Sequence, residues 1–195
     1  MTKDNSVAVK EPTPEQLQAA LPGYVEALKG VRELFLANVM LFGELPAPTF
    51  QETRRIQFLL DRFHESDLHD VAMDDAGNAS AILPGTRRSN VILVAAHADT
   101  VFGEETNHAM QVSQDSIVGP GSADNSLGLA AVASLPMLLE CLGIRLADDL
   151  LLVGTTKSLG RGNLEGMKSF LSTRRVPIRM GVCVEGAELG RLSYS

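Results

Sequence analysis

The chain has 195 residues, of which 45% are hydrophobic, and 24 acidic against 17 basic residues give a formal net charge of -7. This length favours one well-buried core, with at most a small appendage. The basic residues are scattered, which argues against a nucleic-acid partner because phosphate binding needs a concentrated basic surface. No stretch approaches the roughly 18 continuous apolar residues of a membrane span, and the N-terminus lacks an apolar signal region. We therefore expect a soluble, cytoplasmic protein.

The N-terminal third predicts a leader followed by helices. Residues 1–13 are polar, contain proline and show no periodicity, so a disordered leader is predicted there. Apolar residues then recur at helical spacing over residues 15–42. Pro22-Gly23 interrupts this pattern, which predicts one broken helix or two consecutive helices. Thr49, followed three residues later by Glu52, predicts a capping box that opens the next helix.

The remainder predicts strands that alternate with helices. Two short strands are expected near 68–73 and 78–83, joined by a turn. Three continuous apolar runs are typical of strands covered on both faces, at 91–96, 150–154 and 180–184. Helices are predicted between these runs, at 126–142 and 164–173. This alternation predicts an α/β layered sheet.

Two cysteines and three histidines are predicted to have structural or surface positions only. Cys141 and Cys183 lie within apolar runs and are expected to be reduced, buried thiols. His64, His69 and His108 are expected on the surface. None of these five residues is predicted to take part in chemistry.

Polar residues at the ends of the predicted strands are the candidates for chemistry, because ligands of open α/β sheets bind beyond the carboxyl ends of strands. His97 and Asp99 follow the first apolar run, Glu185 follows the third, and Asp124 lies in a glycine-rich turn before a helix. An imidazole and carboxylates suit zinc, and Asp99 could orient His97. Taken singly, His97 could be a structural hydrogen-bonding residue, Asp124 an N-cap and Glu185 a solvated strand end.

Three segments in this order carry a specific resemblance: residues 96–102, 119–130 and 184–191. They resemble the metal-site segments of the co-catalytic zinc metallopeptidase family of peptidase T, glutamate carboxypeptidase and acetylornithine deacetylase, closest to its tripeptidase-like branch. The resemblance covers roughly residues 40–195. It implies an α/β three-layer sandwich of the zinc-exopeptidase type, with a mixed, mainly parallel sheet between helices.

The same resemblance implies roles for the candidate residues. His97 and Glu185 would bind one zinc, Asp124 would bridge two zincs, and Asp99 would orient His97. The implied reaction is hydrolysis of a small peptide or an N-acyl amino acid, in which the zincs polarise the carbonyl and a carboxylate moves the proton. An oligomer is compatible with the sequence, which carries no direct sign of one.

The sequence departs from the family in two ways. Where the family has a Glu-Glu pair, this chain has Ser158 at the position of the general base and Leu159 at that of a ligand of the second zinc. Neither side chain can perform the role, so one zinc site is expected to remain and the second to be lost. Residues 14–195 are also expected to form an incomplete catalytic domain, without the lid domain and the C-terminal part.

Three hypotheses about function remain open at this point. The first is a peptidase-like or amidohydrolase-like enzyme that is weak or inactive as given. The second is a non-catalytic relative that binds a single metal or a peptide. The third is a structural or assembly role without a metal.

Overall fold

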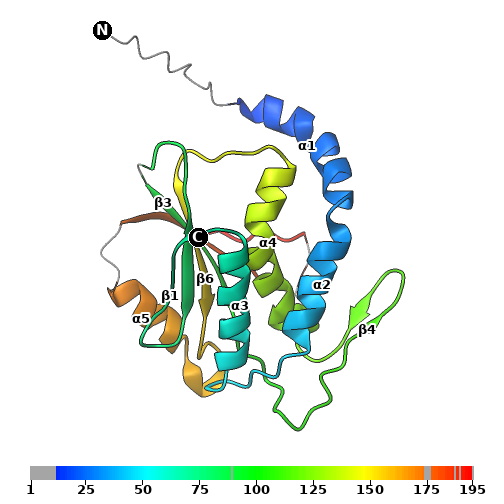
Figure 1. The fold of residues 1–195 in the computed structure, drawn as a ribbon, viewed down its shortest axis with the longest axis vertical. Helices are drawn as coiled ribbons and strands as arrows, with labels where there is room; N and C mark the ends of the chain where they lie inside the picture. Colours follow the sequence, from blue (N-terminus) through cyan, green and yellow to red (C-terminus); the bar gives the residue numbers. More distant parts are fainter. Residues whose placement is uncertain (1–11, 89, 174–176, 187, 189, 195) are drawn as a thin grey trace.

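The structure is a computed structural model, which describes residues 12–88, 90–173, 177–186, 188 and 190–194 (Figure 1). Residues 1–11 of the predicted leader lie outside the described residues. The first helix is α1 (Pro14–Lys29), whose N-terminus is closed by a capping box between Thr13 and Gln16. It is followed by α2 (Arg32–Gly43) and α3 (Thr53–Glu65).

A five-stranded sheet in the order β1-β2-β6-β3-β7 forms the centre of the fold. The strands are β1 (His69–Met73), β2 (Ala79–Leu83), β3 (Val91–His97), β6 (Asp149–Thr155) and β7 (Ile178–Cys183). β3 is parallel to both β6 and β7, whereas β2 is antiparallel to β1 and β6. The predicted mixed sheet is therefore confirmed.

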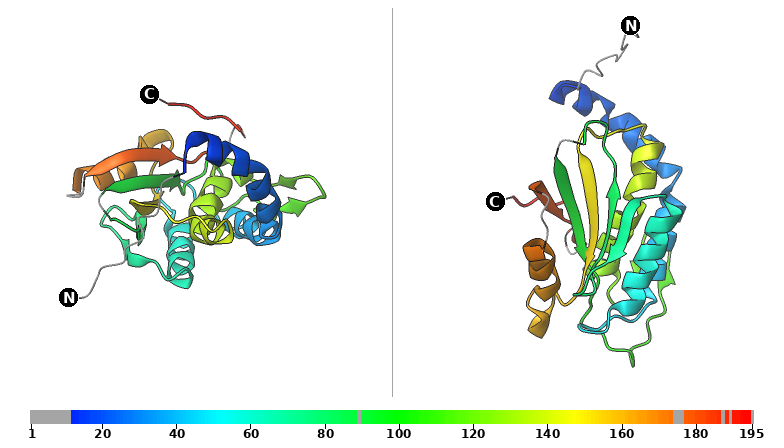
Figure 2. Two further views of the ribbon diagram at one scale, coloured as in Figure 1. Left: turned by 90° about the horizontal axis from the view of Figure 1, so that it is seen from above. Right: turned by 60° about the vertical axis from the view of Figure 1, so that its left-hand side comes forward.

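Helices cover both faces of this sheet. α2, α3 and α4 (Leu127–Cys141) lie on one face, and α5 (Glu165–Thr173) lies on the other, as Figure 2 shows. Within β6, Leu150 and Leu152 enter the larger core beneath α2, α3 and α4, whereas Leu151 and Val153 enter the smaller core beneath α5. Because both faces are buried, the strand reads as a continuous apolar run. The predicted three-layer sandwich is confirmed.

The break between the first two helices lies later in the chain than the sequence predicts. Pro22 and Gly23 are inside α1. The helix ends instead at Gly30, whose N–H donates to the carbonyl oxygens of Ala27 and Leu28. Two consecutive helices are thus confirmed, but the proline was a misleading signal for their boundary.

The capping box predicted for Thr49 and Glu52 is wrong. α3 begins at Thr53, and Glu52 precedes it without a side-chain capping hydrogen bond. The Glu52 carboxylate accepts instead from the N–H of Lys157, at 2.7 Å, and the Thr49 hydroxyl donates to Asp99. Tertiary partners far along the chain have replaced the local cap.

The two cysteines are free thiols, as predicted, but both are exposed rather than buried. Cys183 is exposed because β7 is an edge strand of the sheet, and residues 179–183 along it are exposed. Cys141 is exposed because it is the last residue of α4. An apolar run in the sequence therefore did not imply burial at these positions.

A hairpin formed by β4 (Gln111–Val112) and β5 (Ile117–Val118) was not predicted, because each of its strands has only two residues. Just before it, His108 is buried instead of lying on the surface. Its Nε2 lies 3.0 Å from the carbonyl oxygen of Gly103, so the ring is enclosed by its own loop.

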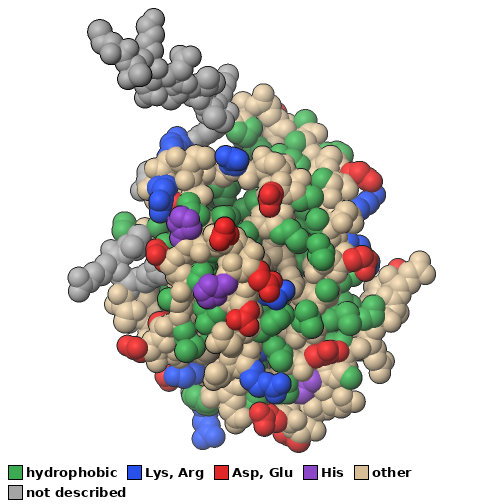
Figure 3. Space-filling model, viewed as in Figure 1, with side chains coloured by type: hydrophobic (Ala, Val, Ile, Leu, Met, Phe, Trp, Pro, Cys, Tyr) green, Lys and Arg blue, Asp and Glu red, His purple; other side chains and the backbone are tan. Residues whose placement is uncertain are grey.

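The outer surface carries charges of both signs. On the face drawn in Figure 3, acidic and basic side chains are interspersed. This distribution agrees with the scattered basic residues of the sequence. Within the described part of the chain, no helix has the length and apolar character that crossing a membrane would require.

Candidate metal centre

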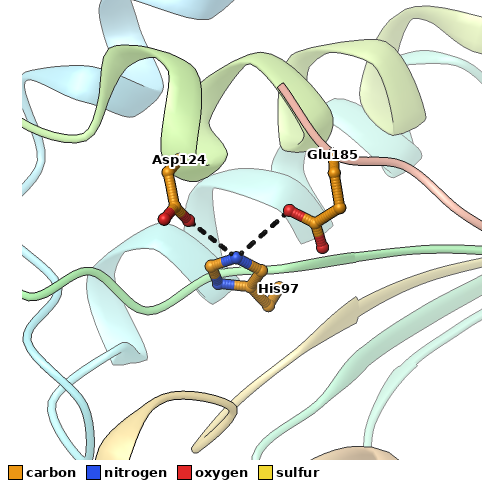
Figure 4. Close-up of side chains that lie close together, drawn as sticks. All are labelled: His97, Asp124 and Glu185. Atoms are coloured by element: carbon orange, nitrogen blue, oxygen red, sulfur yellow. Dashed lines mark ion pairs between the residues drawn. The ribbon is translucent and has the colours of Figure 1, made fainter. Parts of the chain in front are cut away.

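Three side chains from separate segments meet near the carboxyl ends of β3 and β7 (Figure 4). Nε2 of His97 lies 3.0 Å from Oδ1 of Asp124 and 3.5 Å from Oε2 of Glu185. One potential ligand atom from each residue lies within 4.8 Å of the other two. The imidazole is buried and both carboxylates are exposed, so the group opens to solvent. The structure thus brings the three candidates together, and their binding of a metal stays a prediction.

His97 is the last residue of β3 and pairs in register with Thr155 of β6. Its Nδ1 lies 3.0 Å from the backbone carbonyl oxygen of Asp99. Because a carbonyl oxygen can only accept, Nδ1 carries the proton and donates it to this bond. Nε2 is then the nitrogen that faces the two carboxylates, which is the orientation that a metal ligand requires.

Asp124 is presented by the turn Ser122–Ser126. Gly121 precedes the turn with φ of 67°, a left-handed conformation that glycine adopts without a steric penalty. The Ser126 hydroxyl donates to the carbonyl oxygen of Gly121 at 2.7 Å and closes the turn. α4 begins only at Leu127, with Ser126 as its N-cap, so the simpler reading of Asp124 as an N-cap is wrong.

Asn125 ties together the segments that carry the two exposed carboxylates. Its amide nitrogen donates to the carbonyl oxygen of Val184 at 2.9 Å, directly before Glu185. Its amide oxygen accepts from the N–H of Gly128 at 3.0 Å, in the first turn of α4. The side chain is fully buried, so both bonds lie away from solvent. Asn125 therefore sets the position of the end of β7 relative to Asp124.

Gly186 allows the same two segments to approach closely. A Cβ at this position would lie 2.2 Å from the carbonyl oxygen of Ala123, which is backbone and cannot rotate away. We expect Gly186→Ala to separate Glu185 from Asp124, to weaken zinc binding at least about tenfold, and to lower the free energy of unfolding by roughly 1–3 kcal/mol. Chelator competition and urea unfolding measure the two effects.

Gly23→Ala is the matched control for this substitution. Nothing lies within 4 Å of a Cβ at Gly23, which is inside α1. Because alanine favours a helix over glycine by about 1 kcal/mol, this variant should keep its zinc affinity and lose no stability. Equal zinc affinity in the Gly186→Ala and Gly23→Ala variants would show that the close approach at Gly186 does not shape the centre.

Asp99 is fully buried, and its carboxylate is held by three donors at one oxygen. Oδ2 accepts from the Thr49 hydroxyl at 2.9 Å, from the N–H of Ser158 at 2.9 Å and from the N–H of Leu159 at 2.7 Å. Oδ1 lies 3.3 Å from Nδ1 of His97 without a well-directed hydrogen bond, because that N–H points to the Asp99 carbonyl. The Asp99 carboxylate thus places a negative charge beside the imidazole of His97. The backbone carbonyl of Asp99 orients the imidazole ring.

Arg55 places a buried positive charge behind this carboxylate. Its side chain is fully buried and donates to the carbonyl oxygens of Leu45 at 2.8 Å and Ala98 at 3.2 Å. Burial lowers the pKa of the guanidinium to about 10, and the attraction of Asp99 opposes that shift. Arg55 therefore remains charged at neutral pH and favours the ionised form of Asp99.

The pKa values of His97 and Asp99 move apart because the two groups stabilise each other's charge. Burial alone would lower the pKa of His97, but hydrogen bonding and attraction from Asp99 and Glu185 outweigh it and raise this pKa to about 10. Burial alone would raise the pKa of Asp99, but the adjacent His97 and the hydrogen bonds from Leu159, Thr49 and Ser158 lower it to about 2. Without a metal, the centre therefore holds an imidazolium among carboxylates at neutral pH.

The loop after β6 carries Ser158 and Leu159, which stand where the family that the sequence resembles has a Glu-Glu pair. Ser158 is buried beside Asp99, and its hydroxyl lies 3.4 Å from that of Thr155. The backbone N–H groups of Ser158 and Leu159 both bind the Asp99 carboxylate. Glu165, the nearest acidic residue along the chain, is exposed and pairs with Lys157 at 3.0 Å. Among the described residues, the group that could hold an ion has no fourth acidic, histidine or cysteine ligand.

Sequence reasoning missed three residues that build this centre. The sequence pattern predicts a helix cap at Thr49, contains Asn125 only as part of a motif, and indicates no role for Arg55. The available signals were weak. An arginine in an amphipathic helix is most often a surface residue, and an asparagine before an apolar helix is most often a helix cap. The bonds that connect them to the centre, to Ala98, Val184 and Asp99, span 43 to 59 residues of the chain, so local pattern could not identify them.

The donor set fits a zinc ion. Two ligand atoms of a tetrahedral zinc lie about 3.3–3.6 Å apart, because each bond is about 2.0–2.2 Å long. Of the observed separations between Nε2 of His97 and the two carboxylates, 3.5 Å lies within this range and 3.0 Å lies just below it. Three protein ligands would leave the fourth position of zinc open, as in catalytic rather than structural zinc sites.

Solved structures share this fold over most of the chain, whereas no protein-family model and no curated protein sequence matches it. A tripeptidase from Staphylococcus aureus is 20% identical, with a TM-score of 0.64, over 79% of this chain and 43% of its own. The aminopeptidase PepT from Bacillus cereus is 21% identical, with a TM-score of 0.63, over 78% of this chain and 43% of its own. The chain shares the α/β fold of these two solved structures.

A solved structure of an archaeal protein also shares this fold. An aminopeptidase from the archaeon Desulfurococcus kamchatkensis is 12% identical, with a TM-score of 0.63, and the match covers 83% of this chain and 66% of that protein. At these identities the likeness establishes the fold alone. This chain spans 43% of the length of the tripeptidase and of PepT.

Proposed function

We propose that this chain is a peptidase-like hydrolase of peptide or N-acyl amide bonds in small substrates, with one zinc held by His97, Asp124 and Glu185. The observation that carries the proposal is the convergence of these three side chains within 4.8 Å of one another at the carboxyl ends of parallel strands. Ligands of α/β sheets bind at this edge. The likeness of the fold to those of solved peptidases supports hydrolysis of peptide bonds as the reaction. The assignment of the chain to the tripeptidase-like branch is part of this proposal.

The residues of the centre have distinct roles in this proposal. Bound zinc would act as a Lewis acid on a substrate carbonyl. His97 would offer Nε2 to the ion because the Asp99 carbonyl holds its other nitrogen, and Asp124 and Glu185 would neutralise the charge of the ion. Asp99 would orient His97 and raise its basicity from a position that does not touch the metal.

Turnover is expected to be weak because no group at the base position can move a proton. Ser158 stands there, and its hydroxyl does not ionise near neutral pH. General base catalysis contributes about 10²–10⁴-fold to such reactions, which sets the size of the expected deficit. Leu159 likewise offers no ligand for a second zinc.

A second candidate is a binding module that holds the same zinc, and a peptide beside it, without turnover. The observation that favours it is the use of the backbone N–H groups of Ser158 and Leu159, which hold the Asp99 carboxylate and make this loop part of the support of His97. In this reading, the loop after β6 has a structural role in the centre. Both candidates require the same zinc.

Zinc stoichiometry and substrate turnover test the proposal. Purified protein is expected to bind one zinc per chain, measured by elemental analysis after chelator treatment and reloading, and His97→Ala should abolish this zinc. His69→Ala is the control, because His69 is exposed at the start of β1 and should have no effect. Folded wild-type protein without zinc would overturn both candidates.

Hydrolysis of a panel of di- and tripeptides and N-acyl amino acids separates the candidates once zinc is bound. Zinc-dependent turnover that is lost in His97→Ala supports the hydrolase. Zinc binding without turnover of any member of the panel, together with peptide binding by calorimetry, supports the binding module.

A further inference from the structure

α1 carries an apolar stripe that the described chain does not cover. Leu17, Leu21 and Val25 are 45%, 54% and 60% exposed, and they are spaced four residues apart, so they share one side of the helix. We call these three residues the α1 stripe. α1 makes its own contacts through the adjoining side, where Ala20, Tyr24 and Ala27 are half-buried, and through the half-buried Leu28 at the C-terminal end of the stripe. Figure 1 shows α1 at the outer end of the helical layer.

α1 also has little that stabilises it within one copy of the chain. None of its residues is buried. It contains Pro22 and Gly23 in its interior, which are the two residue types that favour a helix least. Helices of this length are marginal in water unless an amphipathic face packs against something. A partner on the α1 stripe would supply the missing packing.

We propose that the α1 stripe is a self-association surface, on which α1 packs antiparallel against α1 of a second copy of this chain. A two-fold axis at Leu21 would place Leu21 against its copy and Leu17 against Val25 of the second copy. Such a contact is self-complementary, because each residue pair occurs twice. The three aliphatic side chains of each helix would then cover those of the other.

The charges of α1 favour this direction of packing. Glu15 lies in its first turn and Lys29 in its last turn. In an antiparallel pair with its axis at Leu21, Glu15 of one copy lies opposite residue 27 of the other, beside Lys29, which pairs with Glu26 of its own helix at 2.6 Å. A parallel pair would place Glu15 against Glu15 and Lys29 against Lys29, which is repulsive. The sequence of α1 therefore suits a second copy of itself in the antiparallel orientation.

The contact is small. Stable protein–protein interfaces bury about 1,200–2,000 Å² in total, and three half-exposed side chains on each copy supply only part of this area. The association is therefore expected to be weak and to depend on concentration. A covalent trap is the appropriate test, because it records the geometry of a weak pair.

The test uses the full chain with Cys141→Ser and Cys183→Ser, since both native thiols are exposed. On this background, Leu21→Cys should form a disulfide-linked dimer under mild oxidation at least tenfold faster than Val118→Cys. Val118 is a matched control because it is 59% exposed on the β4–β5 hairpin. Leu17→Cys and Val25→Cys should crosslink when mixed and much less when oxidised separately.

A second measurement does not depend on cysteines. Sedimentation of the wild-type chain should show a shift toward dimer as its concentration rises, and Leu21→Glu should abolish that shift without changing zinc binding. Equal crosslinking rates at residues 21 and 118, with no concentration dependence in sedimentation, would overturn the proposal. Faster crosslinking of Leu17→Cys alone than of the Leu17→Cys and Val25→Cys mixture would overturn the antiparallel geometry.

Discussion

Asp99→Asn is expected to weaken zinc binding by about 10- to 100-fold, although Asp99 does not belong to the group of three potential ligands. The substitution keeps the shape of the side chain, and its amide oxygen can still accept from the Thr49 hydroxyl and from the N–H groups after β6. It removes the negative charge that lies 3.3 Å from Nδ1 of His97. His97 then becomes a weaker base, and Arg55 loses its nearby opposite charge.

Asp148→Asn is the control for this prediction. Asp148 is also a buried carboxylate, 7% exposed, but it precedes β6 at the other end of the strand and pairs with Arg179 at 3.2 Å. Both variants should lose some stability to urea, because each loses a buried charge with an ionic partner. Only Asp99→Asn should lose zinc affinity. Comparable zinc affinities in the two variants would remove Asp99 from the metal centre.

The metal-free protein is expected to lose stability as the pH rises from about 6.5 to 10. The folded-state pKa of His97 is about 10, above the ordinary histidine value of 6.5. A raised pKa stabilises the fold fully below the unfolded value, and the contribution is lost as the pH rises through the folded value. The loss is about 5 kcal/mol at most. Urea unfolding between pH 6 and pH 9 in the presence of a chelator measures it.

Two comparisons identify His97 as the source of this slope. The metal-free His97→Gln variant lacks the titrating imidazole and should show a much smaller loss. The zinc-loaded wild-type protein should behave similarly, because a bound imidazole has already released its proton. The same alkaline slope in wild type and His97→Gln would contradict the coupling between His97 and its carboxylate neighbours.

Asp99 predicts the opposite behaviour in acid. Its folded-state pKa is about 2, below the ordinary value of 3.8. A lowered pKa contributes stability above the unfolded value, and this contribution is lost as the pH falls through the folded value. The metal-free centre should therefore contribute most to stability between about pH 4 and pH 6.5.

The layers of the fold could be predicted because they depend on local pattern. Continuous apolar runs at β3, β6 and β7 indicated buried strands, and the helices α4 and α5 lay between them where the sequence placed them. The apolar pattern did not predict burial correctly in the edge strand β7. Cys183 belongs to an apolar run, yet it is exposed because β7 has a strand on only one side. The sequence pattern indicates that a segment is an apolar strand, but it does not indicate where that strand lies in the sheet.

The identity of the candidate ligands also followed from the sequence, because polar residues at strand ends must lie at one edge of a parallel sheet. His97 and Glu185 are predicted in this way and Asp124 from the glycine-rich turn before a helix, and the three residues lie together. The sequence could not supply the groups that hold them. Thr49, read as a helix cap, bonds Asp99 across 50 residues, and Asn125 bonds Val184 across 59.

The order of residues by itself determined the α/β class, the strands and which polar residues follow them, because these depend on periodicity and on the turn after each strand. Only the tertiary structure decided which donors stabilise Asp99, which proton His97 carries and which side of α1 is left uncovered. Hydrogen bonds and burial between distant segments depend on how the layers pack, and no local pattern records that packing.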